Sequence, residues 1–129
     1  MNEAATLVGV SADTVRRWID DGSVKARKDE TGHVHIDGAS LAGFVTERAA
    51  SSPIGRTDAN SAPRSLRNHF PGIVTDVVSD VVMSQVSIQA GPFGIVALIS
   101  TESIQELGIT IGSKVVADAK ATNVSLRLP

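Results

Sequence analysis

The sequence predicts an α+β protein made of two small domains joined by a linker. Residues 1–50 carry most of the charge and show a helical apolar spacing followed by short strand-like runs. Residues 51–64 are rich in serine, proline, alanine and asparagine without apolar periodicity, which is typical of a flexible linker. Residues 65–129 are rich in valine, isoleucine, serine and glycine, which favours β-strands.

The composition limits what the chain can be. Hydrophobic residues make up 42% of the 129 positions but aromatic residues only 3%, so aliphatic side chains must fill both cores. The chain has no cysteine, which excludes disulfides and thiolate metal sites. Because two cores of this size are marginally stable alone, we expect self-association. The sequence has neither an apolar stretch that could span a membrane nor a signal-peptide pattern, so we expect a cytoplasmic protein.

Residues 3–22 predict two short helices separated by a tight turn. Gly9 breaks the first helix, and Ser11 is a good N-cap for the second because its hydroxyl can accept from a free backbone N–H. Gly22 ends the second helix. The helical spacing gives this helix a buried face of Val15, Trp18 and Ile19. Two helices joined by a short turn with glycine form a helix-turn-helix pattern.

The next segment predicts a hairpin and a third helix. Residues 24–28 and 33–36 are strand-like, and "DETG" forms the turn between them. Asp37 can cap the third helix. The apolar stripe of that helix consists of Leu41, Phe44 and Val45. A helix-turn-helix followed by a hairpin and a helix is a winged arrangement.

The stretches "VSADTVRRWIDDG" and "GHVHIDGASLAGFV" resemble the DNA-binding domains of the MerR and excisionase type, over residues 2 to 48. The resemblance implies that the helix Ser11–Asp21 enters a DNA groove and that the hairpin contacts the DNA backbone. The candidate DNA-binding residues are Thr14, Arg16, Arg17, Lys25, Arg27, Lys28 and His33.

Charge placement, rather than net charge, favours DNA as the partner. Residues 1–50 contain six Lys/Arg and eight Asp/Glu, a net of −2, but five of the six basic residues fall in the second helix and the hairpin. Because so few cations can contact phosphates, each copy of the domain should bind DNA weakly. We therefore expect a dimer that binds a two-fold related DNA site. The alternative is that Arg16 and Arg17 are only the solvated face of a small domain. His33 and His35 share a strand face but have no third ligand nearby, so no metal site is predicted.

The C-terminal half predicts a five-stranded OB-type β-barrel with one short helix between the third and fourth strands. The helix is "TESIQELG" and is stopped by Gly108. The predicted strands are Asn68–Val78, Val81–Ala90, Phe93–Ser100, Lys114–Ala121 and Val124–Leu128.

Three segments, "SLRNHFPGIV", "VALISTESIQELGI" and "GSKVVADAKATNVSL", resemble in that order the Mop family of molybdate-binding domains, also called TOBE. The resemblance covers residues 65–129. It implies that a tetrahedral oxyanion, molybdate or tungstate, is the ligand and binds at an interface between barrels. The residues that it places in the site are Ser65, Arg67, Ser100, Ser103, Lys120 and Ala121.

The chemistry of these residues suits such a ligand. Molybdate is a dianion with acceptor oxygens only, so a site needs positive charge and many donors. Arg67 and Lys120 can supply charge-assisted hydrogen bonds, and the serines supply hydroxyl donors. Carboxylates do not belong in the site, so Glu102 and Asp118 should point elsewhere. The alternative is that the cations lie on the surface and the serines cap the helix.

Together these patterns predict a molybdate-responsive transcriptional regulator that resembles the ModE regulators. One Mop domain per chain requires a second chain to complete an interface, so we expect at least a dimer, and the resemblance allows a larger ring. The alternative is a molybdate or tungstate storage protein whose N-terminal domain mediates protein contacts. We expect no enzymatic activity, because no acid–base pair, nucleophile triad or phosphate loop is evident.

Overall fold

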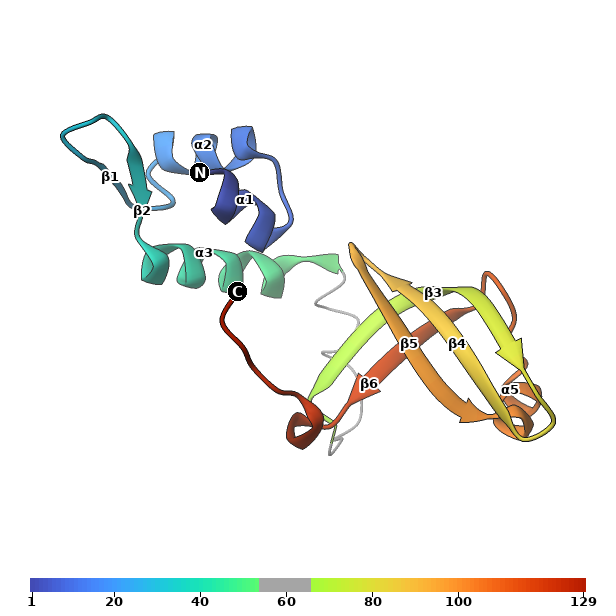
Figure 1. Ribbon diagram of the computed structural model, residues 1–129. Helices are drawn as coiled ribbons and strands as arrows, with labels where there is room; N and C mark the ends of the chain where they lie inside the picture. The colour runs from blue at the N-terminus through green and yellow to red at the C-terminus, as the bar shows by residue number, and fades with distance from the viewer. Residues whose placement is uncertain (54–65) are drawn as a thin grey trace. The chain divides into compact units, whose positions relative to one another are not determined.

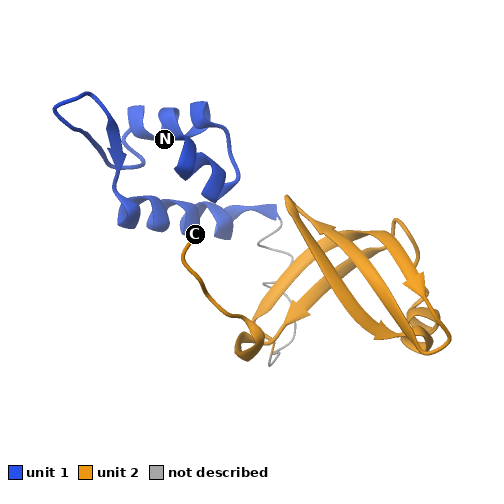
Figure 2. Ribbon diagram, viewed as in Figure 1, with its two compact units in different colours: residues 1–60 blue, residues 61–129 orange. Residues whose placement is uncertain are grey.

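The computed structural model describes residues 1–53 and 66–129. Most of the predicted linker, residues 54–64, and the candidate ligand residue Ser65 lie outside the described residues. The chain divides into two compact units, residues 1–60 and 61–129 (Figure 2). We describe each unit by itself.

Unit 1 begins with the two predicted helices, α1 (Asn2–Val8) and α2 (Ala12–Asp20). Gly9 ends α1 with a φ of 69°, a left-handed conformation that favours glycine. The Ser11 hydroxyl caps α2 by accepting from the backbone N–H of Thr14 at 3.1 Å. Both features confirm the predicted helix, turn and helix.

A two-stranded antiparallel hairpin of β1 (Ala26–Lys28) and β2 (Val34–Ile36) follows, and α3 (Gly38–Ser51) comes after it (Figure 1). Asp37 caps α3 by accepting from the N–H of Ser40 at 2.7 Å. The first strand is shorter than predicted, because Val24 turns into the core and donates its N–H to the Trp18 carbonyl at 2.9 Å. The helix α3 extends one residue into the predicted linker.

The core of unit 1 forms around Trp18, a residue that is 6% exposed. Phe44 on α3 meets the Trp18 ring edge-on at 4.9 Å between centroids, and the Arg48 guanidinium lies 5.5 Å from the ring centroid. These contacts fasten α3 to α2. The buried residues of the core are Ala5, Val15, Trp18 and Val24, and the predicted stripe of Leu41, Phe44 and Val45 packs against them.

Unit 2 is a curled antiparallel sheet in the strand order β5-β4-β3-β6 (Figure 1). A helix, α5 (Thr101–Leu107), lies between β5 and β6, and a 3-10 turn, η1 (Ala121–Asn123), follows β6. The α+β class and the curled OB-type sheet are therefore confirmed. The strands are β3 (Asn68–Ser79), β4 (Met83–Ala90), β5 (Phe93–Ser100) and β6 (Lys114–Ala119).

The predicted fifth strand, Val124–Leu128, is wrong for this structure. Among the described residues the sheet has four strands, and residues 124–129 have no regular structure. The chain leaves the sheet because β6 ends at Ala119 and η1 turns it away. The second strand also starts two residues later than predicted, because the Asp80 carboxylate accepts from the N–H groups of Val82 and Met83.

The curl of the sheet depends on a close approach at Gly72. β3 pairs with β6 from Asn68 to Ile73 and with β4 from Ile73 to Ser79, so Gly72 lies where the strand changes partners. A Cβ atom at Gly72 would lie 2.6 Å from the Gln89 carbonyl oxygen and 2.8 Å from the Ile88 Cγ2. Only glycine fits this approach without a shift of the backbone.

We expect Gly72→Ala to destabilise unit 2 by about 1–3 kcal/mol, because the added methyl group forces two strands apart. Gly94→Ala is the matched control, since a Cβ there meets nothing within 4 Å. Urea unfolding of the full chain can be followed by circular dichroism for the sheet and by Trp18 fluorescence for unit 1. The fluorescence transition should be unchanged in both variants. Equal sheet stability of the two variants would contradict this account.

Candidate functional site

The first candidate surface lies between α2 and the hairpin of unit 1. Arg16 and Arg17 are exposed on the face of α2 opposite its buried residues. A groove of about 270 Å³ between these elements is lined by Arg16, Arg27 and Lys28. The structure thus brings three of the predicted DNA-binding residues together. Asp20 also lines the groove, and Arg16 is 3.4 Å from Asp13, so the surface is mixed in charge.

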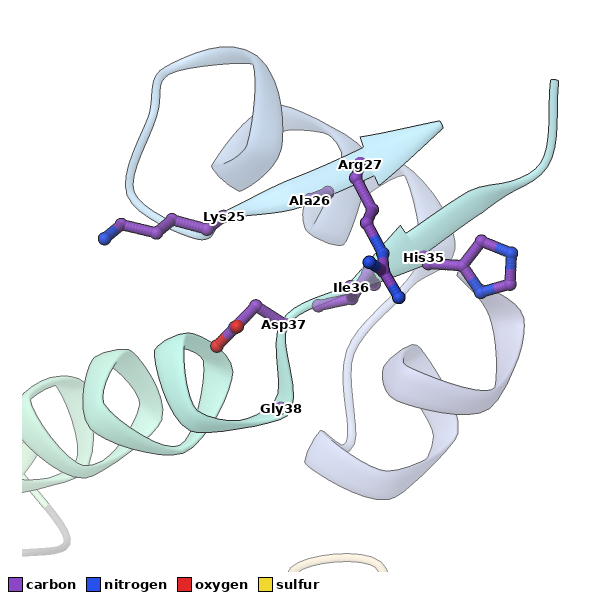
Figure 3. A pocket seen from close by; sticks show the side chains of 7 residues that line it. All are labelled: Lys25, Ala26, Arg27, His35, Ile36, Asp37 and Gly38. Carbon is purple, nitrogen blue, oxygen red and sulfur yellow. The ribbon is translucent and has the colours of Figure 1, made fainter. Parts of the chain in front are cut away.

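A second concave surface, of about 560 Å³, lies on the neighbouring side of the hairpin and is lined by Lys25, Arg27 and His35 (Figure 3). Arg27 and His35 are directly opposite in the strand register and therefore share a face. In Figure 3, Arg27 extends across the hairpin toward Ile36 and His35, whereas Lys25 extends away from both. His35 was not among the predicted DNA-binding residues, although its alternation with Val34 and Ile36 places it on this face.

The tip of the hairpin is held by the Asp29 carboxylate. It accepts from the backbone N–H groups of Thr31 and His33 at 2.9 Å each and from the Thr31 hydroxyl at 2.7 Å. The Nε2 atom of His35 lies 2.8 Å from its other oxygen. The hydrogen bond from Thr31, followed by that from His35, lowers the pKa of Asp29 well below its ordinary value of 3.8. The hairpin tip is therefore a fixed turn.

The remaining predicted DNA-binding residues have structural contacts of their own. The Nδ1 atom of His33 lies 2.6 Å from the Thr31 hydroxyl, while the side chain stays 79% exposed. Thr14 is half-buried, and its hydroxyl lies 2.9 Å from that of Ser11 at the start of α2. Lys25 is exposed, and its backbone N–H donates to the Ser40 hydroxyl at 2.9 Å.

In unit 2, the cationic candidates lie where β3 begins and β6 ends. Arg67 precedes β3 and Lys120 follows β6, and both are exposed. The next residues inward, Asn68 and Ala119, are partners in the strand register, so Arg67 and Lys120 flank the same end of the sheet. The Asn68 side-chain amide donates to the Ala119 carbonyl at 3.2 Å, which gives the asparagine of the "SLRN" motif a structural role.

The next pair along these two strands is His69 and Asp118. The Nδ1 atom of His69 lies 2.5 Å from the Asp118 carboxylate, and the side chains are 15% and 28% exposed. This contact holds Asp118 against β3. Glu102, the other acidic residue that was expected to point away from the oxyanion, is exposed on the first turn of α5.

The serine candidates lie at the start of α5. Ser100 caps the helix by accepting from the N–H of Ser103 at 3.1 Å, and its hydroxyl donates to that of Ser103 at 2.7 Å. Ser84, which is fully buried, anchors this corner with its hydroxyl 2.8 Å from that of Thr101. Ser100 and Ser103 are therefore held by hydrogen bonds to each other, and Ser100 is the cap of α5.

Within one chain, the structure does not bring the predicted oxyanion ligands together. Ser100 pairs with Met83, which follows the end of β3 in the chain. Arg67 directly precedes the first residue of β3, and Lys120 directly follows the residue that pairs with it. That strand has 12 residues and advances roughly 3.3 Å per residue, so the groups occupy opposite ends of the sheet (Figure 1). Arg67, Lys120 and Ala121 form one group, Ser100 and Ser103 form the other, and Ser65 lies outside the described residues.

Comparison with protein families places both units. Residues 64–126 match the TOBE domain family, and residues 1–49 match a helix-turn-helix domain family. The chain joins a helix-turn-helix domain to a TOBE domain. The sheet of the TOBE domain is of the Mop OB type, so the resemblances seen in the sequence are confirmed for both halves.

Two solved structures are similar to the TOBE domain. A molybdate binding protein from Sporomusa ovata is 28% identical with a TM-score of 0.50, and the match covers 52% of this chain and all of that one. MopII from Clostridium pasteurianum is 33% identical with a TM-score of 0.48, over 51% of this chain and all of that one. A comparison with curated proteins gives no match.

Two further searches concern only the residues that the structure describes. They contain no cluster of three or more His, Asp or Glu side chains arranged for a metal ion. None of their helices has the length and apolar character that crossing a membrane requires.

We expect Asp29→Ala to loosen the hairpin tip, because four hydrogen bonds converge on this carboxylate. Amide hydrogen exchange at Thr31 and His33 should become faster, whereas Glu30→Ala should leave it unchanged. Folding lowers the pKa of Asp29, so the ionised carboxylate stabilises the folded hairpin fully at pH values above its ordinary pKa of 3.8. This stabilisation is lost as the pH falls through the lowered pKa of the folded state. Equal protection of both amides in the two variants would refute the role of Asp29.

Proposed function

We propose that the protein is a transcriptional regulator that responds to molybdate or tungstate. The observation that carries this proposal is the union, in one chain, of a helix-turn-helix domain and a TOBE domain. The first type of domain binds DNA, and a structural relative of the second is a molybdate binding protein. A single chain that holds both can couple the concentration of an oxyanion to the occupancy of a DNA site.

The proposed oxyanion site is shared between two chains. Because the two groups of candidate ligands lie at opposite ends of the sheet, one copy would supply Arg67, Lys120 and Ala121 together with Ser65, and another would supply Ser100 and Ser103. Two cations neutralise the dianion and form the strongest hydrogen bonds to it. Hydroxyl and backbone N–H donors complete its shell. In this arrangement the bound oxyanion also holds the two subunits together.

The proposed mechanism follows from that sharing. An oxyanion that binds only when two TOBE domains are correctly placed stabilises that placement by its own binding free energy. The two helix-turn-helix domains are carried on the same chains, so their spacing changes with the arrangement of the TOBE domains. A two-fold related DNA site selects one spacing. If the oxyanion raises the affinity for DNA, then by linkage a DNA site with the matching half-site spacing raises the affinity for the oxyanion by the same factor.

The proposed DNA surface comprises α2, with Arg16 and Arg17, and the hairpin, with Lys25, Arg27 and Lys28. These five cations are exposed, so they can reach DNA phosphates without any change in the packed core of the domain. The proposal also includes Thr14, near the start of α2, and His33, which directly precedes β2. The acidic residues nearby, Asp13 and Asp20, weaken the attraction to phosphates. Binding by one domain is therefore weak, and useful affinity comes from two copies on one DNA.

We expect Arg67→Ala and Lys120→Ala each to weaken molybdate binding by roughly ten-fold or more, since a hydrogen bond to a charged group contributes about 1.5–3 kcal/mol. Isothermal titration of the full chain with molybdate and with tungstate measures this. Lys114→Ala removes an exposed cation from the other end of β6 and should leave the affinity unchanged. Glu102→Gln should not weaken binding either. Wild-type affinity in both Arg67 and Lys120 variants would place the ligand elsewhere.

We expect Arg16→Ala and Arg17→Ala to weaken DNA binding and to reduce the slope of log K against log salt by about one unit each. Lys114→Ala, which removes the same charge from the TOBE domain, is the control. Gel-shift titrations with upstream DNA, with and without molybdate, give both affinity and its response to the ligand. If the wild type has no DNA affinity in either state at low salt but binds many oxyanions per assembly, the protein is a store rather than a regulator.

A further inference from the structure

One face of β3 and β6 carries charged side chains up to the end of the sheet where the cationic candidate ligands lie. His69 on β3 is directly opposite Asp118 on β6 in the strand register. Lys120 comes two residues after Asp118 and keeps an extended backbone, with φ −66° and ψ 141°. Because side chains two residues apart in an extended chain share a face, Lys120 lies on the same face as Asp118. Arg67 comes two residues before His69 at this end of the sheet.

The Asp118 carboxylate is therefore close to the place where the proposed oxyanion would bind. Two residues of a strand span roughly 7 Å. This distance is shorter than the screening length of about 8 Å at physiological ionic strength, so the carboxylate repels a dianion bound there. The charges of Arg67 and Lys120 balance the dianion, and the charge of Asp118 is left over. One further positive charge beside Asp118 would make the whole group neutral.

His69 is the residue that can supply this charge. Its Nδ1 atom lies 2.5 Å from the Asp118 carboxylate. An ionised carboxylate can only accept a hydrogen bond, so Nδ1 carries a proton and Nε2 is the atom that can gain one. No residue that the structure describes forms a hydrogen bond with Nε2. The side chain is 15% exposed, so it can exchange a proton with water, and histidine ordinarily changes its charge between about pH 5 and 8.

The charges around His69 make its protonation depend on the oxyanion. In the described part of the chain, the charged groups at this end of the two strands are Asp118 and Lys120 from β6 and Arg67 from the residues just before β3. Lys114 shares the outward face of β6 but lies at the far end of that strand, and η1 contains no charged residue. Without a ligand, the two nearby cations oppose a charged imidazole. A bound dianion outweighs them and favours it.

We propose that His69 is a positioning residue that couples oxyanion binding to the uptake of one proton. The inference rests on the proposed oxyanion site at Arg67 and Lys120. As the dianion binds, Nε2 gains a proton from water, and the charged ring neutralises Asp118 while it holds that carboxylate in place. By linkage, the affinity is highest at low pH, where His69 is already protonated. It falls as the pH rises through the range in which the oxyanion-bound protein loses this proton.

Titration calorimetry of the full chain with molybdate at about pH 6 and about pH 8 measures the coupling. The wild type should bind roughly five- to ten-fold more tightly at the lower pH, which is the effect of one charge on a dianion about 7 Å away in water. His69→Gln should bind equally at both pH values, since glutamine can donate to Asp118 but cannot gain a charge. The chain has three histidines and the other two lie in unit 1, so His33→Gln and His35→Gln are matched controls that should keep the wild-type pH dependence.

The same titrations in two buffers of different ionisation enthalpy count the protons. The wild type should take up a fraction of one proton per oxyanion at neutral pH, and His69→Gln should take up none. His33→Gln and His35→Gln should take up as many as the wild type.

A gain of affinity separates this role from a merely structural one. Asp118→Asn keeps an acceptor for the Nδ1 hydrogen of His69 but removes the charge of the carboxylate. It should therefore raise the molybdate affinity at about pH 8 by roughly five-fold or more. Asp76→Asn removes an exposed carboxylate from the other half of β3 and should leave the affinity unchanged.

Each outcome decides between the two proposals. A wild-type pH dependence in His69→Gln, or an affinity of Asp118→Asn no higher than that of the wild type, overturns this inference and leaves the proposed function standing. If His69→Gln binds at neither pH, Asp118→Asn decides, because damage to the strand contact cannot raise the affinity. A wild type that binds no molybdate at either pH overturns the proposed function and this inference with it.

Discussion

The close contact between Gly72 and the backbone at Gln89 determines the form of the TOBE domain. Because no side chain stands at position 72, β3 can bend there, leave β6 and continue against β4. One long strand therefore joins two parts of a curled sheet. The start of β3 is separated from α5 by the full length of this strand, which has 12 residues. The division of the candidate ligands into two groups follows from the length of this one strand.

Elements with local determinants could be predicted from the sequence. Ser11 and Asp37 cap the helices that follow them, and Gly9 ends α1, because each of these interactions spans only a few residues. β5 was predicted with its observed bounds, since a run of seven apolar and small residues directly precedes a capping serine, Ser100. Val124–Leu128 was predicted wrongly. Alternation shows that a segment would make an amphipathic strand, but not that an edge is within its reach.

The candidate sites were predictable in composition and not in geometry. The residue types in "SLRN" and "TESIQEL" indicate an anion ligand. Their spacing in the sequence, however, does not show that the two segments lie at opposite ends of the sheet. Similarly, the cations of α2 and the hairpin were evident, whereas the pairing of Arg27 with His35 depends on the strand register. The hydrogen bond from the Ser103 N–H to the Ser100 hydroxyl could not be predicted from the sequence either, because the hydroxyl of a serine before a helix can face a ligand or the helix backbone.

The contacts that close the TOBE domain connect residues far apart in the sequence. Asn68 meets Ala119 and His69 meets Asp118, across 51 and 49 positions, whereas the Asp29 network of the hairpin spans six. Closing a long loop costs more chain entropy and slows folding. We therefore expect the helix-turn-helix domain, which is also synthesised first, to fold well before the TOBE domain. A newly made chain would then have a folded helix-turn-helix domain while its TOBE domain was still unfolded. In the proposed regulator, any response to the oxyanion would begin only after that slower step.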